Sequence, residues 1–100
     1  NKMNIQAMMK QAQKLQKDMV SEKNKIDNEI FEGKSSIVSV KLKGTKEIIE
    51  VKINSDSIEA EDIEMLQDMI MVAINDAMKN IDKETEKRMG KFTQGMPGLF

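Results

Sequence analysis

The sequence predicts an α+β protein in which a long helix, a three-stranded antiparallel sheet and a second long helix follow one another along the chain. Three observations predict this order: a helical period of apolar residues over roughly residues 4–30, an alternating pattern before and after Gly44, and a return to the helical period from residue 62 to about residue 89. A chain of 100 residues makes one domain. We expect this domain over residues 1–91, followed by a flexible tail over residues 92–100, because the stretch from Gly90 to Phe100 carries three of the five glycines and the single proline.

The first helix is predicted from apolar residues that recur at steps of three and four. Glu22 interrupts this series. The resulting seam is narrow, as in helices that pack along one partner helix. Its members are Ile5, Met8, Ala12, Leu15, Met19 and Ile26.

The sheet is predicted from two runs with a period of two. Val38, Val40 and Leu42 alternate with polar residues, and the segment from Ile49 to Ile53 does the same beyond Gly44. Such alternation is typical of a hairpin with one apolar and one polar face. The segment Ile30 to Lys34 is predicted as a third, shorter strand. Because a hairpin alone is only marginally stable, a helix is expected to cover it.

The second helix has acidic residues in its first turn and cations in its last turn, as the helix dipole favours. Between Met65 and Met78, ten of fourteen residues are apolar. A stripe this wide needs more than one surface to pack against, and the candidates are the sheet, the first helix and a second copy of the chain. The residues expected in the core or in a dimer interface are Met65, Met69, Ile70, Ala73, Ile74 and Ala77.

The two helices are expected to project beyond the sheet. Each is about 40 Å long at 1.5 Å per residue, whereas a compact chain of this length has a diameter of about 33 Å. The first helix ends where the sheet begins and the second starts where the sheet stops. The projecting halves should therefore form an antiparallel two-helix arm, held together by Met8, Ala12, Leu15 and Met19.

The charges are unevenly distributed along the chain. The net charge is −1 and the isoelectric point is about 5.5, which weighs mildly against nucleic-acid binding. However, residues 1–20 carry +3 and residues 79–91 carry +2, whereas residues 21–78 carry −6. The sequence therefore predicts an acidic body with basic arms.

The basic residues of the arms recur at helical spacing. Such stripes are often simply solvated helix faces, but lysines with glutamines beside them can also hold phosphates without contacting base edges. No aromatic residues interleave with them, so stacking on single strands is not expected. The candidate phosphate contacts are Lys10, Gln11, Gln13, Lys14 and Lys17 on the first helix, and Lys79, Lys83, Lys87 and Arg88 on the second.

Several function classes are disfavoured. The chain has no cysteine and no histidine, which removes thiolate nucleophiles, the usual catalytic triads and zinc sites with nitrogen or sulfur ligands. The acids between Asp56 and Glu64 lack the spacing and glycine of an EF-hand calcium loop. Asn75 and Asp76 are expected to hydrogen-bond a neighbouring element or a second subunit. We therefore predict no enzyme, no metal or other cofactor and no small-molecule substrate, and the longest apolar run, Met69 to Ile74, is too short to cross a membrane.

Four segments are distinctive in their order and spacing: MMKQAQKLQKDM, EGKSSIVSVKLKG followed by EIIEVKI, EMLQDMIMVAINDAMKNI and the glycine-rich ending. Together they cover nearly the whole chain and resemble the YbaB/EbfC family of nucleoid-associated proteins. The resemblance implies a tweezer-shaped homodimer that binds DNA through its helical arms in the nucleoid of the bacterial cytoplasm. Relatives also occur in plastids, and because the chain begins at Asn1, both locations stay open.

A second function class stays open on the residues alone. Ten methionines supply flexible, polarisable side chains, which promiscuous binding surfaces use. The alternative hypothesis is a protein–protein adaptor or chaperone-like module that captures partners through its methionine-rich helical surface.

Overall fold

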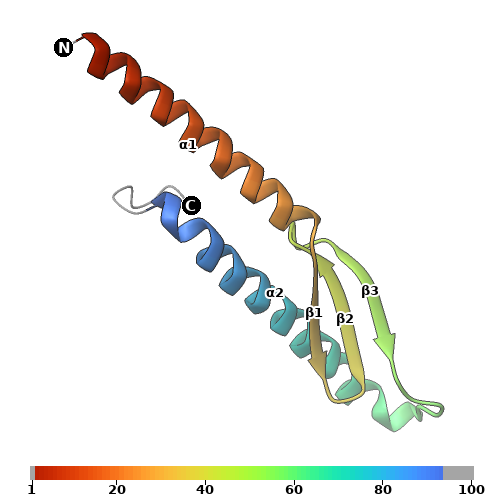
Figure 1. The fold of residues 1–100 in the computed structure, drawn as a ribbon. Coiled ribbons are helices and arrows are strands. Elements are labelled where there is room, and N and C mark those ends of the chain that lie inside the picture. Colours follow the sequence, from red (N-terminus) through yellow and green to blue (C-terminus); the bar gives the residue numbers. More distant parts are fainter. Residues whose placement is uncertain (1, 94–100) are drawn as a thin grey trace.

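The computed structural model describes residues 2–93 of the chain and the side chains of residues 4–92. Its elements confirm the predicted order of helix, three strands and helix (Figure 1). They are α1 (Lys2–Asn28), β1 (Ile30–Ser35), β2 (Val38–Lys43), β3 (Ile48–Ile53), a short 3-10 helix η1 (Ala60–Asp62) and α2 (Ile63–Thr93).

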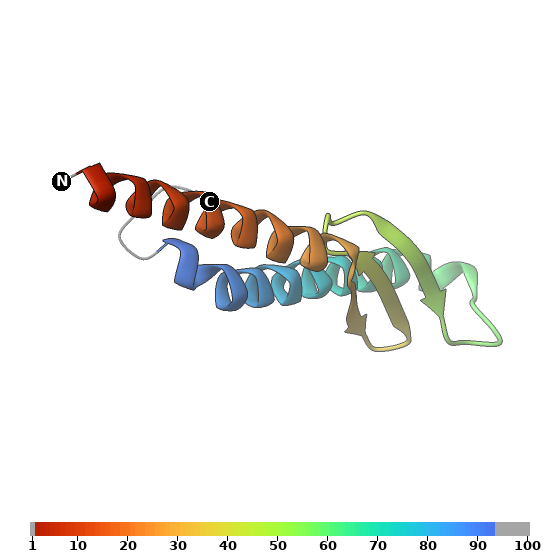
Figure 2. The same cartoon turned by 45° about the horizontal axis from the view of Figure 1, so that its top comes forward.

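The molecule is elongated. Its principal extents are 74 × 21 × 14 Å and its radius of gyration is 20.1 Å, against about 13 Å for a compact chain of 100 residues. In Figures 1 and 2, α1 and α2 run antiparallel and project together beyond one end of the sheet, and α1 extends further than the described part of α2. The predicted overhang of the helices is confirmed.

The sheet has the order β1-β2-β3, and both pairs of strands are antiparallel. Val38, Val40 and Leu42 of β2 are at most 1% exposed. Val51 and Ile53 stand opposite Val40 and Val38, so they continue the same apolar face into β3. They stay 45% and 38% exposed, because α2 packs mainly on β1 and β2.

The core consists of two apolar clusters. The larger one joins β2 to Ala73, Ala77 and Ile81 of α2. Of the residues expected in the core or in a dimer interface, Ala73 and Ala77 are fully buried, while Met69, Ile70 and Ile74 are partly buried against this cluster and Met65 is 54% exposed. The smaller cluster joins Ile26 at the end of α1 to Met89 and Phe92 of α2.

Two side chains of α2 cover the outer edge of β1. The Asp76 carboxylate accepts a hydrogen bond from the backbone N–H of Lys34, with an N–O distance of 3.0 Å. The Asn80 side-chain amide donates one to the backbone carbonyl oxygen of Glu32, at 2.9 Å. Asp76 therefore bonds a neighbouring element, as expected, and strand-edge groups that other chains could pair with are occupied.

The end of α2 differs from the expectation. The second helix was predicted to end near Met89 and the tail to begin at Phe92, but α2 continues to Thr93. Phe92 is only 6% exposed, because it packs against Ile26 and Met89. Residues 94–100 of the predicted tail lie outside the described residues.

Candidate nucleic-acid interface

The projecting part of α1 presents lysines to solvent. Residues 4–18 are all exposed. Lys10, Lys14 and Lys17 lie on the side of the helix away from the seam that ends in Ile26, as their spacing requires. The Lys14 side chain is 80% exposed and its Nζ is 3.8 Å from Asp18. An ion pair this exposed is weak, so Asp18 hardly competes with another anion for Lys14.

Two glutamines belong to the same exposed part of α1. Gln11 and Lys14 border a shallow hollow whose apolar wall includes Met8 and Leu15. Gln13 is also exposed and lies four residues before Lys17, hence on a neighbouring part of the helix surface. Their amides can donate or accept hydrogen bonds beside the ammonium groups, and the helical spacing places Gln11 and Gln13 on opposite flanks of the lysine stripe.

The apolar seam of the arm is only partly used. Met19 packs against the cluster of Ile26, Met89 and Phe92. Met8 and Leu15 are 65% and 43% exposed, so the expectation that they hold the two helices together is wrong within the described chain. The apolar contact between the described parts of the two helices involves Met19 and Ile26 of α1 instead, which pack with Met89 and Phe92 of α2.

The lysines of α2 lie at different places along the helix. Lys79, Lys83 and Lys87 are all exposed. Lys79 lies beside the sheet, since its neighbour Asn80 bonds the backbone of β1. Lys83 follows Asp82, which pairs with Lys46 between β2 and β3, so it lies at the base of the arm. Lys87 precedes Arg88, which bonds Glu22 of α1, so it lies on the part of α2 that runs along α1.

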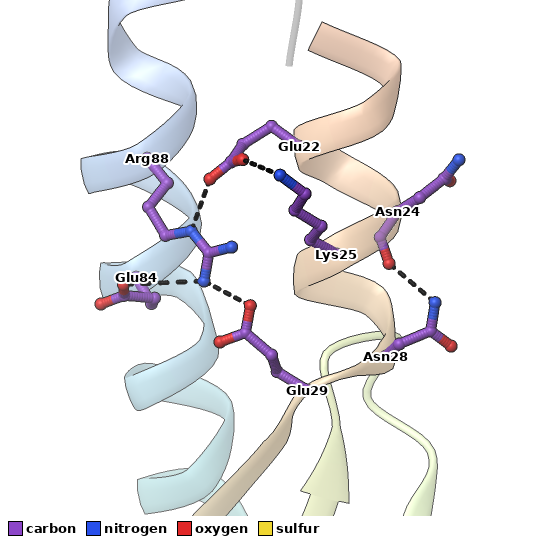
Figure 3. Close-up of polar contacts among 7 residues, drawn as sticks. All are labelled: Glu22, Asn24, Lys25, Asn28, Glu29, Glu84 and Arg88. Atoms are coloured by element: carbon purple, nitrogen blue, oxygen red, sulfur yellow. Dashed lines mark hydrogen bonds and ion pairs between the residues drawn. The ribbon is translucent and has the colours of Figure 1, made fainter. Parts of the chain in front are cut away.

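Arg88 differs from the other candidate contacts because it points into the space between the two helices (Figure 3). Its Nε donates a hydrogen bond to Glu22 of α1 at 2.8 Å. Its Nη1 donates another to Glu29, just after α1, at 2.5 Å, and lies 3.9 Å from Glu84 of α2. The Arg88 side chain is only 21% exposed. Three carboxylates thus surround this one guanidinium.

These contacts change the acidity of the groups involved. The hydrogen bond from Arg88 is the main reason why the pKa of Glu22 lies below its ordinary value, although partial desolvation opposes it. Hydrogen bonds to Glu22 and then Glu29 raise the pKa of Arg88 above its ordinary value. Both shifts favour the charged forms of the Arg88–Glu22 pair.

The opposite end of the molecule is acidic. The segment that follows β3 and leads through η1 into α2 lies at the far end from the N-terminus of α1 (Figure 1). It holds Asp56, Glu59, Glu61 and Asp62. Over the part of the chain that the structure describes, no cluster of three or more acidic residues is placed to hold a metal ion. Neither long helix contains, within the described residues, a stretch apolar enough to cross a bilayer.

Sequence reasoning did not identify the carboxylates around Arg88. Glu22 and Glu29 are 66 and 59 residues away from Arg88 in the chain, so no local spacing relates them. One signal was present, namely that Glu22 interrupts the apolar seam of α1. An acid at a seam position indicates a cation on the facing helix.

Comparisons with known proteins agree with one another. The model of the YbaB/EbfC DNA-binding family matches residues 1–96. A nucleoid-associated protein of Ligilactobacillus salivarius is 42% identical over 99 residues, which cover 97% of this chain and 95% of that protein. A nucleoid-associated protein of Lactococcus lactis subsp. cremoris is 50% identical over 97 residues, which cover 95% of this chain and 98% of that one.

The fold also occurs in a solved structure. An uncharacterized protein of Helicobacter pylori, known from its crystal structure, matches with a TM-score of 0.66 and 27% sequence identity. The match covers 80% of this chain and 86% of that one. The arrangement of helices and sheet is therefore similar in the two proteins.

Proposed function

The chain belongs to the YbaB/EbfC DNA-binding family, and we propose that it is a nucleoid-associated homodimer that binds duplex DNA through phosphate groups with its basic helical arms. The names of the bacterial relatives support a place in the nucleoid. The observation that carries the proposal is the exposure of Lys10, Lys14 and Lys17 on a helix that projects beyond the folded body.

The residue types of the arm favour phosphate contacts over base contacts. Lysine presents a flexible point charge, whereas bidentate recognition of guanine is typical of arginine. The only arginine of the chain, Arg88, is already bonded to carboxylates. Binding should therefore show little sequence preference and a strong dependence on salt.

The exposed apolar surface supports the homodimer. The accessible surface is 7698 Å², whereas a compact monomer of this mass exposes about 5,800 Å². Part of the excess belongs to the projecting α1, but β3 also exposes Ile49, Val51 and Ile53 by 38% to 45%. Apolar patches of this kind are typical of interfaces. A second copy of the chain is the partner that would cover β3.

A salt series of DNA-binding measurements tests the proposal. Changing Lys10, Lys14 and Lys17 together to Gln should weaken binding and reduce the slope of log affinity against log salt by roughly 0.9 for each phosphate that is no longer neutralised. The matched control changes three lysines of the sheet, Lys34, Lys43 and Lys52, to Gln, and so removes the same charge. If the two triple variants behave alike, the arm is not the binding surface.

The adaptor hypothesis retains one supporting observation, because Met8, Met9, Met65 and Met71 are more than half exposed. Pull-down from cell extract with and without nuclease separates it from DNA binding. Partners retained through DNA disappear after nuclease treatment and at high salt. Partners held by methionine side chains persist under both conditions and are insensitive to the arm lysines.

A further inference from the structure

We propose that Arg88 is a positioning residue of the arm: by holding Glu22 and Glu29 it fixes the direction of α1 and hence where the α1 lysines lie, and it does not itself contact phosphate. This inference rests on the proposed function. It changes the role of Arg88, which its position in a basic stretch of sequence suggested to be a direct DNA contact.

The local charge argues against a phosphate contact. Arg88 lies within ion-pair distance of Glu22, Glu29 and Glu84. Lys25, whose Nζ is 4.0 Å from Glu22, adds a second cation, and Lys91 is a third that acts on Glu22, so the three carboxylates already have cationic partners. A phosphate approaching Arg88 would have to displace a carboxylate that the guanidinium already holds.

The geometry suits a positioning role. Glu22 lies within α1, whereas Glu29 is the single residue between α1 and β1. Arg88 uses different nitrogens for the two, Nε for Glu22 and Nη1 for Glu29 (Figure 3). The rigid fork of the guanidinium therefore fixes two points at the base of the arm, which restricts both the tilt and the rotation of α1.

Among residues 4–92, whose side chains the structure describes, few other contacts hold the arm. The apolar contact between the two helices is the small cluster of Ile26, Met89 and Phe92 with Met19 beside it, and the α1 residues 4–18 are exposed. The free part of α1, from Lys2 to Asp18, is about 25 Å long. A tilt of about 10° at its base therefore moves its tip by about 4 Å, enough to separate a lysine from a phosphate.

Distances between spin labels test the positioning role without DNA. The chain has no cysteine, so Gln16→Cys on α1 and Glu86→Cys on α2 provide a clean pair of sites. Dilution with unlabelled protein isolates the distance within one chain. Glu22→Gln with Glu29→Gln should broaden or shift this distance by several ångströms, as should Arg88→Gln. Arg88→Lys, which lacks the fork, should have a smaller effect, and Lys87→Gln, which removes the same charge one residue away, should have none.

DNA affinity gives a second test, because the two possible roles of Arg88 predict opposite changes in affinity. Neutralising Glu22 and Glu29 removes two negative charges, which would strengthen DNA binding if Arg88 were thereby freed to hold a phosphate. The positioning role predicts the opposite, a roughly fivefold weaker binding that corresponds to about one phosphate fewer held by the arm. Circular dichroism checks that the variants remain folded, which is expected because glutamine has the shape of glutamate.

An unchanged label distance in the double glutamine variant, or tighter DNA binding by it, overturns the positioning role. Failure of the wild-type protein to bind DNA would instead refute the proposed function. The distance measurement would still decide whether Arg88 fixes the direction of α1, so the two failures are distinguishable.

Discussion

The backbone of Gly33 in β1 lies so close to Ala73 in α2 that a β-carbon on residue 33 would be 2.1 Å from the Ala73 carbonyl oxygen. The same position is 2.5 Å from the backbone nitrogen of Ala77. Ala73 and Ala77 are themselves fully buried. The strand and the helix thus meet through three of the smallest residues, and this contact sets the distance between α2 and the sheet.

Replacing Gly33 should therefore destabilise the fold. Gly33→Ala pushes a methyl group into backbone atoms that cannot move without separating α2 from β1, and we expect a loss of at least about 2 kcal/mol in the free energy of unfolding. Urea denaturation measures it. Gly90→Ala is the control, because a β-carbon there meets nothing within 4 Å, and it should stabilise the helix by about 0.5–1 kcal/mol. Equal midpoints for Gly33→Ala and wild type would contradict the close contact.

The hydrogen bond between Asp76 and Lys34 predicts a local effect on the edge of β1. Asp76→Ala leaves the Lys34 N–H without its acceptor and should cost about 1 kcal/mol. Asp76→Asn keeps an acceptor oxygen and should cost less. Amide hydrogen exchange at Lys34 should become faster in the alanine variant. Asp68→Ala, another aspartate change on α2, should leave this exchange rate unchanged.

The main elements were predictable because their periods are local. The steps of three and four in α1 and α2, and the alternation in β2, appear in windows of about a dozen residues. The end of α2 was not predictable in this way. Gly90 disfavours a helix by its intrinsic propensity, but the burial of Phe92 against Ile26 outweighs it, and that contact joins segments far apart in the chain.

In the candidate interface, too, the local features were predictable from sequence and the contacts between distant segments were not. The exposure of Lys10, Lys14 and Lys17 follows from their spacing relative to the apolar seam. The surroundings of Arg88 follow only from the antiparallel pairing of two helices, which brings Glu22 opposite it. A charge stripe on one helix can be predicted from sequence, whereas the partner of each charge depends on tertiary structure.

The lowered pKa of Glu22 predicts a loss of stability in acid. A carboxylate whose pKa is lower in the folded protein than in the unfolded chain stabilises the fold above its ordinary pKa, which is 4.5. This contribution is lost as the pH falls below that value and through the lowered pKa. Between pH of about 5 and 3, the urea midpoint should therefore fall further for wild type than for Glu22→Gln. As a control, the urea midpoint of Glu86→Gln, a change at an exposed glutamate of α2, should fall by as much as that of the wild type.

The position of the α2 lysines predicts unequal effects on DNA binding. Lys87 lies on the arm beside Arg88, which bonds α1, and Lys83 lies at its base, whereas Lys79 lies beside β1. Changing Lys83 and Lys87 to Gln should weaken binding about three- to fivefold at low salt and reduce its salt dependence. Lys79→Gln should weaken binding less than Lys83→Gln alone or Lys87→Gln alone. A filter-binding or gel-shift series at several salt concentrations measures both quantities, and an equal effect of all three lysines would contradict an arm-centred contact.

The two edges of the sheet predict where a second copy binds. Asp76 and Asn80 cover the edge of β1, whereas every residue of β3 is exposed. Val51→Glu places a charge on the open apolar face of β3 and should shift the mass in sedimentation equilibrium from that of a dimer towards the 11.4 kDa of one chain. Lys52→Gln changes the charge by the same amount on the opposite face of the strand and should leave the dimer intact. A wild-type mass of one chain at micromolar concentration would contradict the homodimer, and dissociation by both variants would place the interface elsewhere than on the apolar face of β3.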